Sequence, residues 1–147
     1  ERVVFAWDGS DRAETAVRPL VEWGLFGRAH VDVLSVADAE PPWWVRAGMV
    51  SEETAAEAYH EAAEPSRRQH EEMAEQMAEW LRTAGLSAVP LSREGDPAET
   101  IVAFAEAHEV DLIVLGSHGR TGLRRLLMGS VARNVLLHAH CSVLLAR

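Results

Sequence analysis

The chain contains no lysine; all 14 of its basic residues are arginine. This absence excludes two common kinds of site, because a Walker P-loop needs the lysine of its Gly-Lys-Ser/Thr sequence and pyridoxal enzymes need a Schiff-base lysine. The single cysteine, Cys141, excludes an internal disulfide and a cysteine-rich zinc site. No apolar run approaches the ~20 residues of a membrane span, and no secretory signal is evident. We therefore expect a cytoplasmic protein with no membrane partner.

Acidic residues are also absent after Asp111. The whole chain has a formal net charge of −9, yet residues 112–147 contain five arginines and neither Asp nor Glu, a local charge of +5. A cationic segment within an acidic protein can concentrate an anionic ligand on one face. The overall negative charge argues against nucleic acid as a partner. The alternative interpretation is that the segment is mostly buried sheet and helix, and that its few arginines are simply solvated.

The strongest ligand signal is a glycine pattern that follows the apolar run 110–115. It has the form Gly-x2-Gly-x9-Gly-Ser and consists of Gly116, Gly119, Gly129 and Ser130. Glycine lets a ligand approach the main chain closely, because it has no Cβ and can adopt positive φ. The pair Gly129 and Ser130 stands where a helix should begin, and the free N–H groups and dipole of a helix start attract anions. The spacing predicts a site for the phosphates of a nucleotide.

Strand and helix signals alternate along the 147 residues, a length that suits one domain. We expect strands at 2–7, 31–36, 86–91, 110–115 and 141–146, with helices starting near Asp11, spanning 96 to about 108, and spanning 129–139. The alternation predicts a parallel sheet covered by helices on both faces, with right-handed crossovers. Ligands bind such sheets at the carboxyl ends of the strands, where Asp8 and Gly116 can meet at one switch point.

The region 37–83 is expected to form an irregular loop and then helix. Pro65 lacks an N–H and clashes with the preceding turn, so the sequence predicts a short helix ending near Ala63 and a longer one from Pro65. Trp43 and Trp44 stand beside prolines and form either a partner surface or, as we favour, a lid folded over the second strand. Helical spacing typical of core packing is shown by Met73, Met77, Trp80 and Leu81.

The seven histidines invite a search for a metal site. His60 and His70 lie among glutamates, on what the sequence indicates is a solvated helix. His138 and His140 are two residues apart at a turn and have no carboxylate close in sequence. We therefore expect no metal held by protein side chains.

Four landmarks in order along the chain resemble the universal stress protein (UspA-like) family. They are Asp8, Gly9 and Ser10 after the first strand, the turn Gly95, Asp96 and Pro97, the Gly-x2-Gly-x9-Gly-Ser pattern, and the ending 138–145. The resemblance implies one domain over 1–147, an α/β fold of the adenine nucleotide alpha hydrolase-like kind, with a five-stranded parallel sheet in the order 3-2-1-4-5. The chain departs from the family at Trp7, where a smaller aliphatic residue is common and the indole would crowd or pack the nucleotide side. It also departs at His140 and Ser142, which replace two prolines.

The resemblance further implies an adenine nucleotide, ATP or else ADP or AMP, with Mg²⁺ or Mn²⁺ carried by its phosphates. The implied contacts are Asp8 with the ribose, Ala6 and Val36 with adenine, Gly116, Gly119 and Arg120 along the phosphate loop, and Gly129, Ser130 and Val131 at the terminal phosphates. No catalytic residue is implied, because no general base is evident near the γ-phosphate.

The function expected from this resemblance is that of an ATP-binding regulatory protein of the stress response. It would act as a homodimer through the apolar segment 141–146, an expected edge strand with unpaired backbone groups. Two alternatives stay open at this point. One is a slow ATPase or nucleotide-transfer enzyme of the same fold, and the other is a dimerisation module whose pocket stays empty.

Overall fold

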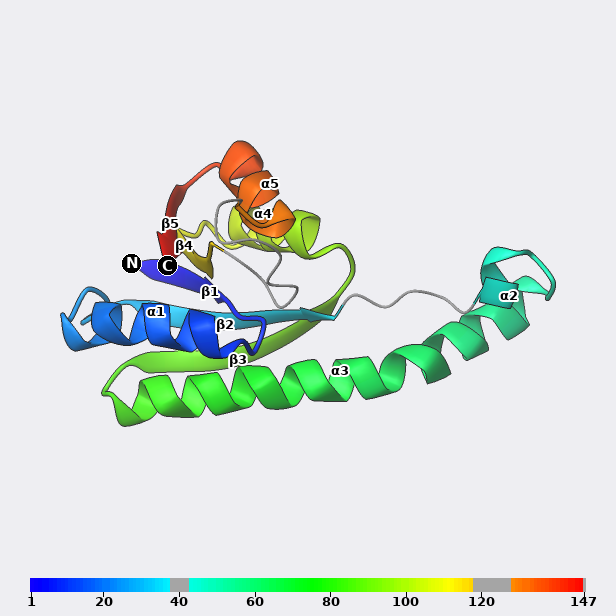
Figure 1. The fold of residues 1–147 in the computed structure, drawn as a ribbon, viewed down its shortest axis with the longest axis horizontal. Coiled ribbons are helices and arrows are strands. Elements are labelled where there is room, and N and C mark those ends of the chain that lie inside the picture. Colours follow the sequence, from blue (N-terminus) through cyan, green and yellow to red (C-terminus); the bar gives the residue numbers. More distant parts are fainter. Residues whose placement is uncertain (38–42, 118–127, 147) are drawn as a thin grey trace.

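The computed structural model describes residues 1–37, 43–117 and 128–146. Its centre is a five-stranded sheet in the order β3-β2-β1-β4-β5 (Figure 1). The strands are β1 (Arg2–Ala6), β2 (His30–Ala37), β3 (Ser87–Glu94), β4 (Leu112–Gly116) and β5 (Ser142–Ala146). All four strand pairs are parallel. The strand order and direction expected from the sequence are therefore confirmed.

Two helical layers cover the sheet. The helices are α1 (Asp11–Glu22), α2 (Trp43–Arg46), α3 (Glu52–Thr83), α4 (Pro97–Ala107) and α5 (Ser130–His138). One core cluster joins the sheet to α1 and α3, and a second joins it to α4 and α5 (Figure 1). Among the helices within the described residues, none is both long enough and apolar enough to cross a membrane.

Side chains of the central strand β1 alternate between these two layers. Val3, Phe5 and Trp7 pack in the cluster with α1 and α3, whereas Val4 and Ala6 pack in the cluster with α4 and α5. The alternation follows from the two-residue period of a strand. Because helices cover both faces, the strand is apolar almost throughout, as is typical of parallel sheets.

The helix α3 runs without interruption through Pro65, so the predicted break near Ala63 is wrong. It begins at Ser51, whose hydroxyl accepts a hydrogen bond from Thr54 N–H at 3.3 Å. Figure 1 shows one curved helix that extends past the end of the sheet. A proline leaves the carbonyl four residues earlier, that of Glu61, without its helical partner. Pro65 and Glu61 are both exposed, so water can reach that carbonyl and the helix continues.

The predicted lid formed by Trp43 and Trp44 is also wrong. These residues begin the short helix α2, which packs against α3 near its start, away from β2 (Figure 1). The long α3 extends beyond the sheet and offers α2 a nearer surface than the sheet edge. The predicted core stripe of α3 is confirmed, since Met77 and Leu81 are buried and Met73 and Trp80 pack against the same cluster.

A buried carboxylate, that of Asp32, connects strands at the edge of the sheet where their amino-terminal ends lie. Asp32 on β2 is only 2% exposed and accepts a hydrogen bond from Arg2 Nε at 2.7 Å. His30 Nε2 lies 3.3 Å from the other carboxylate oxygen. The backbone N–H of Arg2 donates to Asp111 at 2.9 Å, just before β4. A buried charge with such partners avoids the large cost of an unpaired one, so β1, β2 and β4 are tied together at this edge.

Replacing Pro65 by alanine should stabilise the protein. The change restores an N–H donor and removes the ring clash, an effect of up to ~3 kcal/mol in a helix interior. We expect the thermal midpoint, followed by circular dichroism, to rise by roughly 3 °C or more. The control is Gln69→Ala, an exposed change one turn further along α3 that should leave the midpoint nearly unchanged. A lower midpoint for Pro65→Ala would show that the proline has a role that the helix geometry does not reveal.

Candidate functional site

The candidate site lies at the carboxyl ends of β1 and β4, where the chain order in the sheet reverses. From β1 the chain proceeds to β2 on one side, while β4 and β5 lie on the other. Ala6 is the register partner of Leu34 on β2 and of Leu115 on β4. Open α/β sheets bind ligands in the crevice outside such a switch point. The predicted proximity of the ends of β1 and β4 is confirmed.

Backbone hydrogen bonds hold the start of α5 beside the end of β4. Ser117 N–H donates to the carbonyl of Ala146 on β5 at 2.9 Å, and the Ser117 carbonyl accepts from Gly129 N–H at 2.9 Å. Ser117 and Gly129, which flank the segment 118–128, are therefore in direct contact. Two predicted contacts, Gly119 and Arg120, lie within that segment and outside the described residues.

The start of α5 differs from the starts of α3 and α4. Ser51 caps α3, and Asp96 caps α4 by accepting Glu99 N–H at 2.9 Å. At α5 the N-cap is Gly129, and no side chain among the described residues caps this helix. Gly129 has φ −59° and ψ 151°, an extended conformation that any residue can adopt. What glycine contributes here is the absence of a side chain, which leaves the first N–H groups of α5 without a competing acceptor.

Four further predicted contacts lie in α5 and on β1 and β2. Ser130 is exposed, and Val131 is half-buried in the cluster formed with α4. Ala6 and Val36 pack in the same cluster, from β1 and β2. The structure thus brings three of the predicted contacts onto the face of the sheet covered by α4 and α5.

Asp8 stands just past the end of β1 and is half-buried. Its Oδ1 accepts a hydrogen bond from Ser10 N–H at 3.0 Å, an interaction that shapes the turn. Between them Gly9 has φ +74°, and a Cβ added there would overlap the sulfur of Met73 on α3. Asp8 therefore has a structural role in the turn, in addition to the ligand contact predicted for it.

Trp7 lies on the face opposite Ala6, the residue predicted to contact adenine, contrary to the expectation that its indole would crowd or pack that side. It is 8% exposed and packs in the cluster with α1 and α3. The reason is the strand period: with Ala6 directed to one layer, the next side chain must face the other.

A polar pair beneath this turn was missed by the sequence analysis. Ser35 on β2 donates its hydroxyl hydrogen to the Trp7 carbonyl at 2.9 Å, and His70 Nδ1 on α3 lies 2.8 Å from the same hydroxyl. The expected solvated position of His70 is wrong, because this side chain is buried, whereas His60 is exposed as expected. Two signals were available: Ser35 interrupts an apolar strand, and His70 lies one heptad before Met77 on the core stripe of α3.

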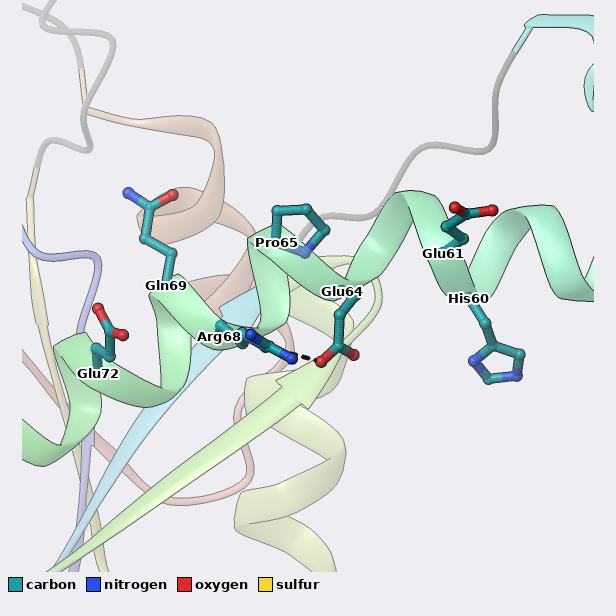
Figure 2. Close-up of a pocket in the computed structure, with 7 residues that line it drawn as sticks. All are labelled: His60, Glu61, Glu64, Pro65, Arg68, Gln69 and Glu72. Carbon is teal, nitrogen blue, oxygen red and sulfur yellow. Dashed lines mark hydrogen bonds and ion pairs between the residues drawn. The ribbon is translucent and has the colours of Figure 1, made fainter.

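A hollow of about 600 Å³ lies elsewhere, along α3 (Figure 2). None of the predicted contacts lines it; its lining consists of His60, Glu61, Glu64, Pro65, Arg68, Gln69 and Glu72. All of these come from one helix, and their side chains extend to both sides of it (Figure 2). Arg68 is paired with Glu64 at 2.9 Å, so the lining keeps an acidic excess that disfavours an anionic ligand. We therefore place the candidate site at the switch point.

The thiol of Cys141, next to β5, has no features of a reactive nucleophile. Burial raises its pKa, and the negative charge of Asp111 raises it further, although a backbone hydrogen bond at Ile113 acts in the opposite direction. A raised thiol pKa lowers the thiolate fraction at neutral pH, and the thiolate is the reactive form.

Comparisons with known proteins agree with this geometry. The model of the universal stress protein family matches residues 1–147. Universal stress protein MJ0531 of Methanocaldococcus jannaschii is 34% identical over 150 residues, which cover 100% of this chain and 82% of that protein. The structure of universal stress protein UspA from Lactobacillus plantarum superposes with a TM-score of 0.78 at 24% identity, covering 99% of this chain and 97% of that one. It shares the α/β fold class expected from the sequence.

A further solved structure contains a ligand. It is the universal stress protein from Archaeoglobus fulgidus in complex with dAMP, with a TM-score of 0.60 and 26% identity. The match covers 99% of this chain and 97% of that chain.

Cys141 should alkylate with a pH dependence displaced to higher pH. Because its thiol pKa is raised, the rate of reaction with iodoacetamide should reach half its maximum above the pH observed for an ordinary cysteine. The same chain unfolded in urea is the control, since it contains no other cysteine. A midpoint in the folded protein at or below that of the unfolded chain would contradict this environment for the thiol.

Proposed function

The chain belongs to the universal stress protein family, and we propose that residues 1–147 form one domain of an ATP-binding regulatory protein that acts as a homodimer. The observation that carries the nucleotide proposal is the start of α5, which has no side-chain cap among the described residues and is held against the end of β4 by the bond between Gly129 and Ser117. N–H groups at a helix start and the positive end of the dipole favour phosphate.

Charge supports an anionic ligand at this place. The segment 112–147, which contains β4, α5 and β5, carries +5 within a chain of net charge −9. Arg133 is exposed on α5, one turn from its start. Arginine is well suited to phosphate, and a cationic region inside an acidic protein concentrates anions there.

The remaining parts of a nucleotide fit the neighbouring residues. In this proposal Asp8 binds the ribose hydroxyls, and Ala6 and Val36 contact adenine on the face covered by α4 and α5. Gly116, Gly119 and Arg120 follow the phosphate chain, while Ser130 and Val131 hold its end. A divalent ion, Mg²⁺ or Mn²⁺, would be held by the phosphates and would neutralise part of their charge. The dAMP complex of the Archaeoglobus fulgidus protein supports an adenine nucleotide as the ligand class.

Catalysis is not part of the proposal. The segment that would surround the terminal phosphate, 112–147, contains no Asp or Glu to act as a base. Phosphoryl transfer to water depends on a group that positions or activates the water. Nucleotide binding would instead alter the surface around the start of α5.

Dimerisation is proposed through β5, the edge strand of the sheet (Figure 1). The Ser142 N–H donates to the Asp111 carbonyl, and the Ala146 carbonyl accepts from the Ser117 N–H. Both groups therefore point to the side of β4. Since N–H groups alternate in direction along a strand, those of Val143 and Leu145 face the open edge. On α5, the helix that precedes β5, Leu136 and Leu137 are 47% and 64% exposed. Unpaired backbone and exposed apolar side chains favour a second copy of the strand.

The variant Gly129→Asp should make the unliganded protein more stable and weaken its binding of ATP. A carboxylate at this N-cap would accept the first N–H groups of α5 and stabilise the unliganded protein by about 0.5–1 kcal/mol. It would also occupy the proposed phosphate position and repel the negative charge of the nucleotide. Saturating Mg-ATP, at about 100 times Kd, should raise the thermal midpoint of the wild type by roughly 5 °C or more and that of Gly129→Asp hardly at all.

The matched control is Asn134→Asp, which adds the same charge to an exposed position of α5 and should keep the ATP-induced shift. An unchanged wild-type midpoint at saturating ATP, ADP and AMP would refute the nucleotide proposal. Retention of the full shift by Gly129→Asp would refute its placement at α5.

The variant Val143→Pro should dissociate the dimer, because proline removes an N–H that faces the open edge. We expect sedimentation equilibrium to give a dimer for the wild type and a monomer for the variant. Ser142→Ala, on the same strand, keeps every backbone N–H and should remain dimeric. A monomeric wild type, or a dimeric and folded Val143→Pro, would exclude β5 as the interface.

A further inference from the structure

The carbonyl of Trp7, the last before Asp8, is held by a side chain. The Trp7 N–H still bonds to the Leu34 carbonyl on β2 at 2.9 Å, as in a parallel ladder. In the part of the chain that the structure describes, no backbone N–H donates to the Trp7 carbonyl. The hydroxyl of Ser35 does so instead, at 2.9 Å. The position of the peptide group between Trp7 and Asp8 therefore depends on Ser35.

The direction of the hydrogen bonds can be assigned from the groups involved. A serine hydroxyl has one hydrogen, and a carbonyl can only accept, so the hydrogen of Ser35 points to Trp7. His70 Nδ1, 2.8 Å from the same oxygen, must then be the donor. Nδ1 of His70 therefore carries a hydrogen.

We call the two hydrogen bonds from His70 to Ser35 and from Ser35 to the Trp7 carbonyl the relay. Both of its side chains are buried. Ser35 is 0% exposed and His70 is 8% exposed. Removing one partner would leave buried polar groups unsatisfied, which is costlier than losing a solvated hydrogen bond. One turn further along α3, Met73 contacts the turn at Gly9, where a Cβ would overlap its sulfur. Hence α3 holds the turn 7–9 at two points, from the face opposite α4 and α5.

We propose that His70 and Ser35 are positioning residues for Asp8, an inference that rests on the proposed nucleotide site. They touch no ligand; they hold the peptide group before Asp8, so that its carboxylate is directed to the ribose before the nucleotide arrives. A group that is ordered in advance loses less conformational entropy on binding. The relay thereby increases nucleotide affinity through the backbone of β1.

A neighbouring serine provides a matched control. Ser92 on β3 is the register partner of Ser35 on β2. Its hydroxyl oxygen is buried and has no hydrogen-bond partner among the described residues. Ser92→Ala therefore removes a buried hydroxyl from the same level of the sheet without breaking the relay, whereas Ser35→Ala breaks it.

The test combines nuclear magnetic resonance with nucleotide titration on four variants. The ¹⁵N shifts of His70 should show the proton on Nδ1 in the wild type. Amide exchange at Ser10, whose N–H donates to Asp8, should be about tenfold faster in Ser35→Ala and unchanged in Ser92→Ala. The Kd for ADP should rise by about tenfold in Ser35→Ala and in His70→Leu. The variant His70→Asn should keep most of the wild-type affinity, because its amide can donate from the position of Nδ1.

Each result has a defined meaning. An Nδ1 without a proton, unchanged exchange at Ser10 in Ser35→Ala, or equal effects of Ser35→Ala and Ser92→Ala would overturn the proposal. A wild type that binds no adenine nucleotide would refute the proposed function, while the exchange at Ser10 would still test whether the relay holds the turn. If Ser35→Ala does not fold, the contrast between His70→Leu and His70→Asn decides, and no recovery in His70→Asn overturns the inference.

Discussion

The candidate site depends on one backbone hydrogen bond, from Gly129 N–H to the carbonyl of Ser117. It places the first turn of α5 against the end of β4, beside the carboxyl end of β1. Without this closure the helix start would be an ordinary solvated terminus, and its N–H groups would point at no common position. With it, the start of α5 and exposed Ser130 lie at the end of β4, whose neighbour β1 leads into the turn at Asp8.

The two faces of the sheet differ at this end. The face covered by α4 and α5 carries the residues proposed to contact the ligand, among them Ala6, Val36 and Val131. The opposite face, covered by α1 and α3, contacts the same turn through Met73, and His70 supports it through Ser35. Because strand side chains alternate, one strand can bind a ligand on one face while the other face holds its backbone in place.

The two edges of the sheet also differ in how their polar groups are satisfied. At the amino-terminal edge, the carboxylate of buried Asp32 already has Arg2 and His30 as partners within the protein. At the carboxyl edge, the start of α5 has no side-chain cap among the described residues. A charged group that is already paired has little to offer a ligand, whereas unsatisfied donors favour an anion. This contrast supports the carboxyl edge as the place where function resides.

The sequence alone determined the alternating strands and helices, and through the four family landmarks it indicated the sheet order and the residues around Gly116 and Gly129. These features depend on local patterns and on spacing, which a single chain displays directly. Tertiary structure decided the continuity of α3 through Pro65, the position of α2 and the burial of His70. Each of these depends on which surfaces are close in space. The helix continues through Pro65 because this residue is exposed, and His70 is a core residue because Ser35, on another element, accepts a hydrogen bond from it.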